Sequence, residues 1–446
     1  MADRLSARAA IAALTTEFEE LTDDAFDDGT GDDGPLSWAG YADSRARATA
    51  RTGERESVVH GLASLGGQSC VLVSFEFGFL GGSLGQRTGD RLVAAYEAAG
   101  RRGLPLVSLI ATGGSRMQEG MIALTQLQRV AHASARLRAA GPAQIAVLRD
   151  PTTGGGWATL GAGADVVLAL PGAQVGFAGS RVRPPDADPA AYTAEGQLAA
   201  GQVDAVVAPR ELPGTVGRWL RALHLPKDPP PPAPVPRALS AAGLPGTGWD
   251  AVCQARSASR PRAEAYLDAY FSYRLPLVGD RCGGTDPGLL AGFGRREDRS
   301  VAYVAQCGTA TRPAGYRTAA RVIRLADRLG LPVLTLIDTP GAANDAEAER
   351  AGAGAAIADA FAAVAAARVP LTTLVIGEGG SGGALALAAP GNTHVTPDSY
   401  FSVIAPELAA AILKRTPDQV RATADQLRLR PQDLVELGFA RSVVGP

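Results

Sequence analysis

RGLPLVSLIATGGSRMQEG, residues 102–120, is the stretch that decides the fold. Its apolar residues 104–110 predict a short strand, which breaks at Gly113-Gly114 and is followed by a helix. Glycines at such a turn let the backbone approach a ligand and leave N–H groups free to point at it. A second stretch, AVLRDPTTGGGWATL at residues 146–160, has the same order of strand, glycine turn and helix.

Both turns recur in the second half of the chain. GLPLVSLIATGG at residues 103–114 matches GLPVLTLIDTPG at residues 330–341, and Gly155-Gly156 matches Gly382-Gly383. The offset between the two copies is identical for both turns, because position 103 corresponds to 330 just as position 155 corresponds to 382. Two copies are too few for a repeat array, so we interpret the chain as two homologous domains.

The composition excludes several classes of function. Lys and Arg (43) nearly balance Asp and Glu (45) in the 446 residues, so the sequence does not predict an electrostatic nucleic-acid binder. The four cysteines lie far apart with no C-x-x-C pair, which argues against a zinc ribbon or a disulfide framework and predicts no metal. No secretory leader and no run of about 20 apolar residues occur, so we expect a cytoplasmic protein without a membrane span.

The pattern along the chain predicts strands that alternate with helices. A hairpin is expected over residues 289–306, and the helix after Gly113-Gly114 is expected to bury Leu124, Leu127 and Ala131. Such alternation favours parallel pairing in an α/β fold. The acidic residues 18–34 predict a solvated loop. The proline-rich residues 225–237 predict a linker between domains at 1–224 and 238–446, with peptide recognition as the alternative.

Side-chain chemistry is weakly supported. None of His60, His132, His224 and His394 lies in a glycine turn, and the two G-x-S-x-G patterns, at residues 81–85 and 379–383, have no base placed beside them. G-x-G-x-x-G occurs at residues 29–34 and 377–382, which leaves dinucleotide binding open. Paired N–H groups at the glycine turns would instead stabilise an oxyanion such as a thioester enolate. The alternative is that the glycines only permit tight turns.

These motifs resemble a known family. FGFLGGSLG (77–85), ATGGSRMQEG (111–120), DPTTGGGWATLGAGAD (150–165) and GFAGSRV (176–182) are similar to the β-subunit carboxyltransferase of bacterial acetyl-CoA carboxylase. GYRTAARVIRLADRLGLPVLTLIDTPGA (315–342), VIGEGGSGGALALA (375–388) and YFSVIAPE (400–407) are similar to its α subunit. The chain therefore resembles a β–α fusion, and the resemblance implies an α/β fold of two tandem crotonase-like (ββα-spiral) domains.

The resemblance also implies a reaction and partners. The first half would bind acyl-CoA, and the second would receive carboxybiotin from a biotin carboxyl carrier protein that a biotin carboxylase loads. A homodimer is expected. The catalytic backbone would be Gly113, Gly114, Gly155, Gly156, Gly382 and Gly383. The substrate-binding residues would be Gly81, Gly82, Phe177, Ala178, Gly179, Arg181, Gly341, Gly379 and Gly380.

The sequence departs from the family in three places. The β-subunit zinc ribbon is missing, Ala343-Asn344-Asp345 replaces a tyrosine–proline–glycine run, and the loop before GYR is shortened to residues 307–314. The last two changes fall on the biotin-facing half. They keep open a biotin-independent decarboxylase acting on malonyl-CoA or another malonyl thioester, and a non-catalytic scaffold is the third hypothesis.

Overall fold

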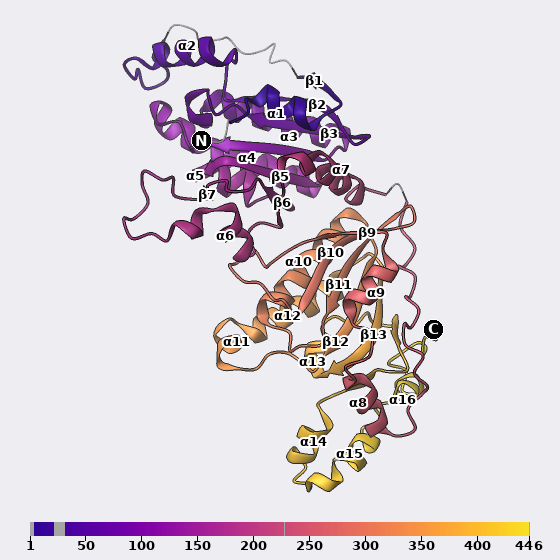
Figure 1. Cartoon of the computed structure of the whole chain (residues 1–446). Helices are drawn as coiled ribbons and strands as arrows, with labels where there is room; N and C mark the ends of the chain where they lie inside the picture. The colour runs from indigo at the N-terminus through magenta and orange to yellow at the C-terminus, as the bar shows by residue number, and fades with distance from the viewer. Residues whose placement is uncertain (1–3, 22–31, 227, 446) are drawn as a thin grey trace. The chain divides into compact units, whose positions relative to one another are not determined.

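The computed structural model describes residues 4–21, 32–226 and 228–445 (Figure 1). The chain divides into two compact units, Met1–Leu225 and Pro226–Pro446, which are described separately below.

Unit 1 is built on one sheet with the strand order β1-β2-β3-β4-β5-β6-β8, and β7 pairs with β5. β1, β2 and β3 are antiparallel neighbours, whereas the strands from β3 onward are parallel. The strands are β1 (Glu17–Glu20), β2 (Val58–Leu65), β3 (Gln68–Phe75), β4 (Leu106–Thr112), β5 (Gln144–Thr153), β6 (Val166–Ala169), β7 (Val175–Gly176) and β8 (Ala205–Val206).

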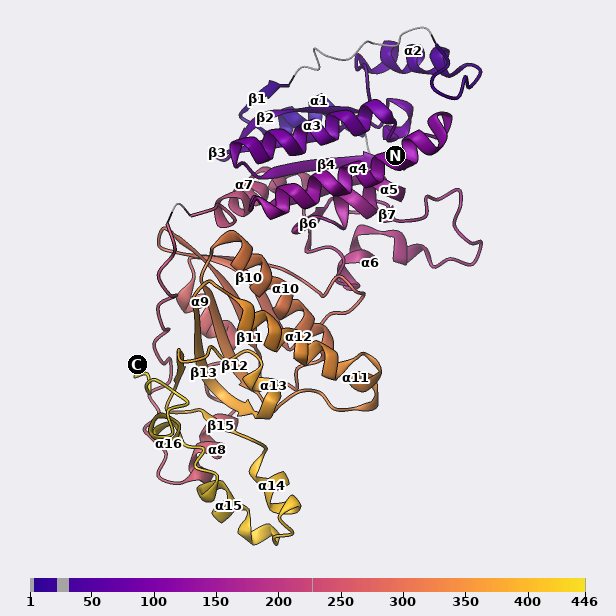
Figure 2. The same ribbon diagram turned by 180° about the vertical axis from the view of Figure 1, so that it is seen from behind.

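Helices cover both faces of this sheet. α3 and α4 lie together on one face, as Figure 2 shows, while α1 and α7 pack against each other and against β3 on the other. The core beneath α3 contains alternate residues of β3, Val71, Val73 and Phe75, as a strand with a period of two requires. The helices of unit 1 are α1 (Ala7–Leu14), α2 (Tyr41–Thr52), α3 (Gln86–Arg102), α4 (Gly120–Ala139), α5 (Gly154–Gly156), α6 (Ala194–Ala199) and α7 (Leu212–Ala222).

Unit 2 repeats this plan with the order β14-β13-β12-β11-β10-β9, and β15 pairs with β13. The predicted hairpin over residues 289–306 is confirmed as β10 and β11, which pair in register from Leu289 with Gln306. The strands are β9 (Tyr273–Pro276), β10 (Leu289–Arg296), β11 (Arg299–Gln306), β12 (Val333–Thr339), β13 (Leu371–Gly380), β14 (Thr393–Val395) and β15 (Tyr400–Ser402).

In unit 2, α10 packs on β10 and β11 and α12 packs beside α10 (Figure 2), while α9 packs on the other face with Val301, Tyr303 and Ala305 of β11. The helices are α8 (Gly248–Arg256), α9 (Ala263–Tyr270), α10 (Pro313–Leu329), α11 (Ala346–Arg350), α12 (Ala353–Ala366), α13 (Ser381–Leu385), α14 (Pro406–Ile412), α15 (Val420–Gln426) and α16 (Pro431–Glu436).

The duplication predicted from the sequence extends to the elements themselves. α3 and α10, β4 and β12, and β5 and β13 have the same lengths and are separated by the same offset as the sequence motifs. α3 and α10 both end at a glycine in the left-handed region, Gly103 and Gly330, which L-residues with a Cβ rarely adopt. Each unit therefore brings two strand-to-helix turns, after β4 and β5 or after β12 and β13, to the carboxyl ends of adjacent parallel strands.

Two sequence-based expectations are wrong. Residues 18–20 of the predicted acidic loop instead belong to β1 (Glu17–Glu20), which pairs antiparallel with β2; residues 22–31 lie outside the described residues. The predicted apolar face of α4 is wrong at two of its three positions, whereas Leu127 is half-buried and packs against the core of unit 1 as expected. Leu124 is 46% exposed and Ala131 is exposed, whereas α4 buries Ala123, Val130 and Leu137 on a neighbouring stripe.

The proline-rich segment contacts unit 2 at several points. Tyr270 Oη donates a hydrogen bond to the Pro234 carbonyl at 2.9 Å, and Thr372 Oγ1 donates to the Ala233 carbonyl at 2.8 Å. Ala233 is buried within the core beneath α9. Part of this segment is therefore ordered by contacts with the sheet of unit 2.

Candidate active site

The two turns of unit 1 lie against each other. A Cβ built on Gly154 would lie 3.0 Å from Gly114 Cα, and one built on Gly114 would lie 4.0 Å from Gly155 N. Gly114 and Gly154 have φ values of 111° and 64°, where a side chain would be strained. Glycine at both positions therefore allows the backbone after β4 to approach the start of α5.

Unit 2 has the same arrangement. Cβ atoms built on Gly380 and Gly383 would overlap the Pro340 carbonyl and the Ala342 nitrogen, so the turn after β12 touches the start of α13. Gly341 has φ 141°, like Gly114, and Ser381 has φ 58° at the position equivalent to Gly154. The match holds for the backbone even where the residue type differs.

The N–H groups of Gly113 and Gly114 are already engaged. Gly113 N donates to the Gly81 carbonyl at 2.9 Å, and Gly114 N donates to Thr112 Oγ1 at 3.0 Å. These two predicted donors therefore have internal acceptors, a feature that the sequence did not reveal.

The N–H of the next residue, Ser115, differs from those of Gly113 and Gly114 in its hydrogen bonding. It forms a parallel bridge with Leu84, in which Leu84 N donates to the Gly114 carbonyl and Arg116 N donates to the Leu84 carbonyl. In this pattern the N–H of Ser115 points away from Leu84. Among the residues that the structure describes, no hydrogen bond takes the Ser115 N–H.

Each unit has a second candidate N–H donor, which lies at the start of a helix. Gly155 is the second residue of α5, and its N–H belongs to the first turn, which has no intrahelical acceptor. The preceding Thr153 forms no side-chain cap. Gly382 has the same place in α13, where Gly380 precedes the helix and a Cβ on Gly382 would meet nothing within 4 Å.

The first donor is also repeated in unit 2. Ala342 bridges Thr311 as Ser115 bridges Leu84, and Gly341 N donates to Thr339 Oγ1 at 3.1 Å as Gly114 N donates to Thr112. Ser115 with Gly155 in unit 1 and Ala342 with Gly382 in unit 2 are therefore equivalent pairs of N–H groups that have no acceptor among the described residues. Such preorganised N–H pairs can hold a developing oxyanion.

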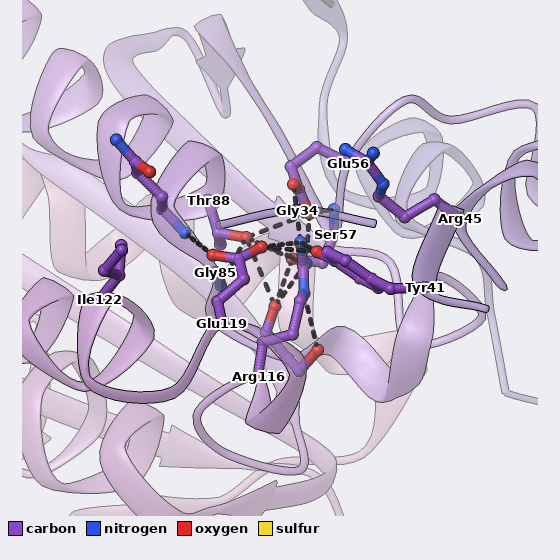
Figure 3. A network of polar contacts seen from close by, with 12 residues as sticks. Gly34, Tyr41, Arg45, Glu56, Ser57, Gly85, Thr88, Arg116, Glu119 and Ile122 are labelled. Carbon is purple, nitrogen blue, oxygen red and sulfur yellow. Dashed lines mark hydrogen bonds and ion pairs between the residues drawn. The ribbon is translucent and has the colours of Figure 1, made fainter. Parts of the chain in front are cut away.

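A buried ionic network supports the turn after β4 (Figure 3). The guanidinium of Arg116, next to Ser115, is 1% exposed; it contacts both carboxylate oxygens of Glu56 and donates to Glu119 Oε1 at 3.2 Å. Tyr41 Oη donates to the same Glu119 oxygen at 2.5 Å. Burial alone would raise the pKa of Glu56, but the charge and hydrogen bonds of Arg116 hold that pKa below its usual range. Sequence reasoning missed this network, whose one signal is the spacing of Arg116 and Glu119.

A different network supports the turns of unit 2. The fully buried Asp338, at the end of β12, accepts from Arg260 Nη2 at 2.6 Å and from the Glu378 N–H at 3.2 Å. Glu378 in turn accepts from Arg256 Nε and Tyr400 Oη, both at 2.8 Å. The hydrogen bond from Glu378 N to Asp338 therefore joins the end of β12 to β13 just before Gly379-Gly380.

The other predicted residues surround the turns of their own units. Gly154 N donates to the Phe177 carbonyl at 3.0 Å, so the segment containing Phe177, Ala178 and Gly179 lies beside α5. The Phe177 side chain is 73% exposed, and Arg181 is exposed. Gly82 packs on the Ala111 carbonyl, and Gly379 packs on the Phe401 ring.

Other chemistries gain little from the geometry. Ser83 Oγ accepts from Arg116 Nε at 3.2 Å, and His394 contacts Ser442 and Asn392. Within the described ranges, no group of three His, Cys, Asp or Glu side chains could hold a metal ion. Nor does any described helix have the length and apolar character needed to cross a membrane.

Comparison with protein families matches both halves of the chain. Residues 246–445 match the model described as acetyl co-enzyme A carboxylase carboxyltransferase-like, and residues 32–206 match the carboxyl transferase domain. Acetyl-coenzyme A carboxylase carboxyl transferase subunits beta/alpha of Saccharopolyspora erythraea are 38% identical over 435 residues, which cover 92% of this chain and 76% of the relative. The protein of the same description from Salinispora arenicola is 38% identical over 431 residues, covering 91% of this chain and 76% of the relative.

Solved structures share the fold. Transcarboxylase 12S with methylmalonyl-coenzyme A and methylmalonic acid bound has a TM-score of 0.80 at 21% identity, covering 99% of this chain and 87% of that chain. A single-chain, multi-domain long-chain acyl-CoA carboxylase has a TM-score of 0.76 at 22% identity, covering 99% of this chain and 46% of that chain. These similarities confirm the predicted α/β fold with two crotonase-like domains.

Proposed function

This chain belongs to the family of acetyl-CoA carboxylase carboxyl transferases in which β- and α-type parts are joined, and we propose that it moves a carboxyl group from carboxybiotin to the α-carbon of an acyl-CoA. Carboxybiotin would arrive on a separate carrier protein that a biotin carboxylase loads. The observation that carries this proposal is the pair of N–H donor turns, which occurs once in each unit at equivalent positions of the duplicated fold.

The proposal assigns one donor pair to each substrate. Ser115 and Gly155 N–H groups would hold the thioester oxygen of the acyl-CoA, and those of Ala342 and Gly382 would hold the ureido oxygen of biotin. Loss of CO₂ from carboxybiotin leaves electrons on the ureido group, which takes a proton from the acyl α-carbon. The resulting enolate carbon then bonds to CO₂. Negative charge appears on two oxygens in turn, and main-chain donors stabilise each without a side-chain base.

The acyl-CoA would extend from the first donor pair along unit 1. Phe177 offers an exposed ring beside α5, and Arg181 offers a cation that can pair with a phosphate. Gly81, whose carbonyl accepts from Gly113 N and where a Cβ would meet nothing within 4 Å, leaves open space beside the β4 turn. These residues are proposed as the path of the coenzyme A moiety.

Partial reactions test the proposal. The purified chain is incubated with malonyl-CoA in the presence and absence of free biotin, and release of acetyl-CoA and CO₂ is measured. We expect decarboxylation that requires biotin, because this is the reverse of the proposed transfer. Gly354→Ala, on α12 where a Cβ meets nothing within 4 Å, is the matched control and should behave as wild type. Absence of turnover with an intact fold would refute the proposal and favour a scaffold.

A second candidate is a biotin-independent malonyl-thioester decarboxylase. The observation that favours it is the altered segment after the turn of unit 2, where Ala343 is buried with Ala348 and Ala353 in place of the family's tyrosine–proline–glycine run. The same assay separates the two functions. Release of CO₂ at equal rates with and without biotin would establish this alternative.

We further propose that the active protein is a homodimer. Apolar side chains are exposed on both units: Met117, Met121 and Leu124 near the start of α4 in unit 1, and Phe361, Leu408 and Ile412 in unit 2. Phe361 also lines an apolar cavity of about 350 Å³ with Leu385 and Phe439. Exposed apolar side chains favour a protein interface where they form a contiguous patch. Light scattering should give twice the chain mass, and Phe361→Asp should shift it toward the monomer.

A further inference from the structure

Two neutral side chains join the donor turns of unit 2. Tyr316, near the start of α10, donates from Oη to the Gly383 carbonyl at 3.0 Å. Gln306, the last residue of β11, donates from Nε2 to the same carbonyl at 3.3 Å and to Thr311 Oγ1 at 3.0 Å. Both side chains are buried, at 0% exposure for Gln306 and 1% for Tyr316.

Thr311, which accepts from Gln306, is also hydrogen-bonded to the turn after β12. Its N–H donates to the Gly341 carbonyl at 3.0 Å, and its carbonyl accepts from Ala343 N at 2.9 Å. These two bonds bracket Ala342, the first proposed donor of unit 2. The single amide of Gln306 therefore links the turn containing Ala342 to the helix start containing Gly382.

The Gly383 carbonyl is available because α13 does not use it. Ala386 N donates to the Gly382 carbonyl and Leu387 N to the Ala384 carbonyl, so the intervening carbonyl accepts only from side chains among the described residues. Gln306 Oε1 is buried and has no partner in this described part. The two bonds donated by Nε2 fix the orientation of the Gln306 amide. That orientation leaves Oε1 buried without a donor, which is unfavourable for the folded state.

The connection is specific to unit 2. Ala302 pairs with Val333 as Val71 pairs with Leu106, and Val333 and Leu106 are equivalent positions of β12 and β4. Gln306, four residues after Ala302, therefore corresponds to Phe75, four residues after Val71. The offset between α3 and α10 places Tyr316 where α3 has Gly89. Neither Phe75 nor Gly89 has a polar side-chain group, so unit 1 cannot form these bonds and is supported by Arg116 instead.

We propose that Gln306 and Tyr316 are positioning residues that set the spacing of the Ala342 and Gly382 N–H groups for the ureido oxygen of biotin, an inference that rests on the proposed function. Burial raises the pKa of the Tyr316 phenol above its ordinary value, so it stays protonated and donates at physiological pH. Neither side chain contacts substrate in this role. They act only through the main chain.

The test removes single donors and compares matched variants. Tyr316→Phe deletes the Oη donor and keeps the ring, and Gln306→Met deletes the amide at similar volume. Tyr270→Phe is the control, because it also removes a buried phenol that donates to a main-chain carbonyl of unit 2, that of Pro234, but lies on α9. Biotin-dependent decarboxylation of malonyl-CoA gives kcat and both KM values. Hydrogen exchange of residues 381–389 reports whether α13 is held.

We expect Tyr316→Phe to lower kcat by about 10-fold and the double variant by about 10²-fold, since a misplacement of about 1 Å can lower a rate by about 10²-fold and a smaller one by less. The KM for malonyl-CoA should stay within about 2-fold, because the acyl side belongs to unit 1. Exchange should accelerate at residues 381–389 and remain unchanged at residues 154–162.

Two results would overturn the inference. The first is a kcat for Tyr316→Phe no lower than that for Tyr270→Phe. The second is unchanged exchange at residues 381–389. Exchange needs no turnover, so it tests the positioning role even if wild type shows no biotin-dependent activity, and that separate result would refute the proposed function.

Discussion

Gly383→Ala is the sharpest single test of the main-chain donors. A Cβ at this position would lie 2.6 Å from Tyr316 Oη, closer still to Ala342 N, and 3.0 Å from the Gly341 carbonyl carbon. Ordinary contacts begin near 3.4 Å, so the new methyl needs about 0.8 Å more distance from Tyr316 Oη, somewhat more from Ala342 N and about 0.4 Å more from the Gly341 carbonyl carbon. Two of the three are backbone atoms of the opposing turn, which cannot rotate away as a side chain would.

The expected loss follows from that displacement. Moving Ala342 away from α13 widens the spacing of the proposed donors by almost 1 Å, and a misplacement of about 1 Å can lower a rate by about 10²-fold. Overpacking of this kind typically lowers the free energy of unfolding by about 1–3 kcal/mol, which a domain of this size tolerates. We therefore expect a folded protein with kcat reduced by about 10²-fold.

The assay is biotin-dependent decarboxylation of malonyl-CoA, with urea unfolding measured on the same samples. Gly354→Ala adds the same methyl to α12 in open space and should change neither quantity. A Gly383→Ala protein that folds and retains more than half of the wild-type kcat would contradict the proposed donor geometry.

Three further predictions concern the same two units. Gly113→Ala should keep near wild-type kcat, because its Cβ would meet only the Gly81 carbonyl at 3.5 Å; a large loss would show that this residue contacts substrate. Gly382→Ala should keep its unfolding free energy and raise the KM for biotin, because its Cβ would enter open space beside the donor pair; an unchanged KM would place biotin elsewhere. The pKa of Glu56 is depressed in the folded state, so its contribution to stability is present above the ordinary value of 4.5 and lost as pH falls through the folded pKa. Glu56→Gln should therefore be less stable at pH 7, by about 3–5 kcal/mol, and flatten the acid side of the stability profile measured by urea unfolding; an unaltered profile would contradict the pairing with Arg116.

The sequence predicted the parts of this fold that local pattern determines. The constant offset between matching motifs correctly predicted the duplication, since glycine-containing turns and apolar strands recur in the same order. Leu124 was misplaced because periodicity on α4 identifies an apolar stripe without telling whether the sheet or another surface covers it.

The donor assignment depended on contacts distant in sequence. Gly113 and Gly114 looked free because glycine turns commonly expose N–H groups, but Gly81 and Thr112 accept from them in the folded chain. Gln306 and Tyr316 were also invisible as partners, because the bond that joins each of them to Gly383 spans 77 and 67 residues. Only the folded structure shows that, among the described residues, the N–H without an internal acceptor is one residue further along, at Ser115.

Ser115→Ala tests whether the chemistry belongs to the main chain or to this hydroxyl. Ala342 occupies the equivalent place in unit 2 with the same bridge geometry, so the backbone there needs no hydroxyl. Removing Ser115 Oγ keeps the N–H, and we expect kcat within about 2-fold of wild type in malonyl-CoA decarboxylation. A nucleophilic serine would instead lose about 10⁴-fold or more on the same change. A loss of that size in a folded variant would transfer the catalytic role from the amide to the side chain and remove the basis for treating the two units as equivalent.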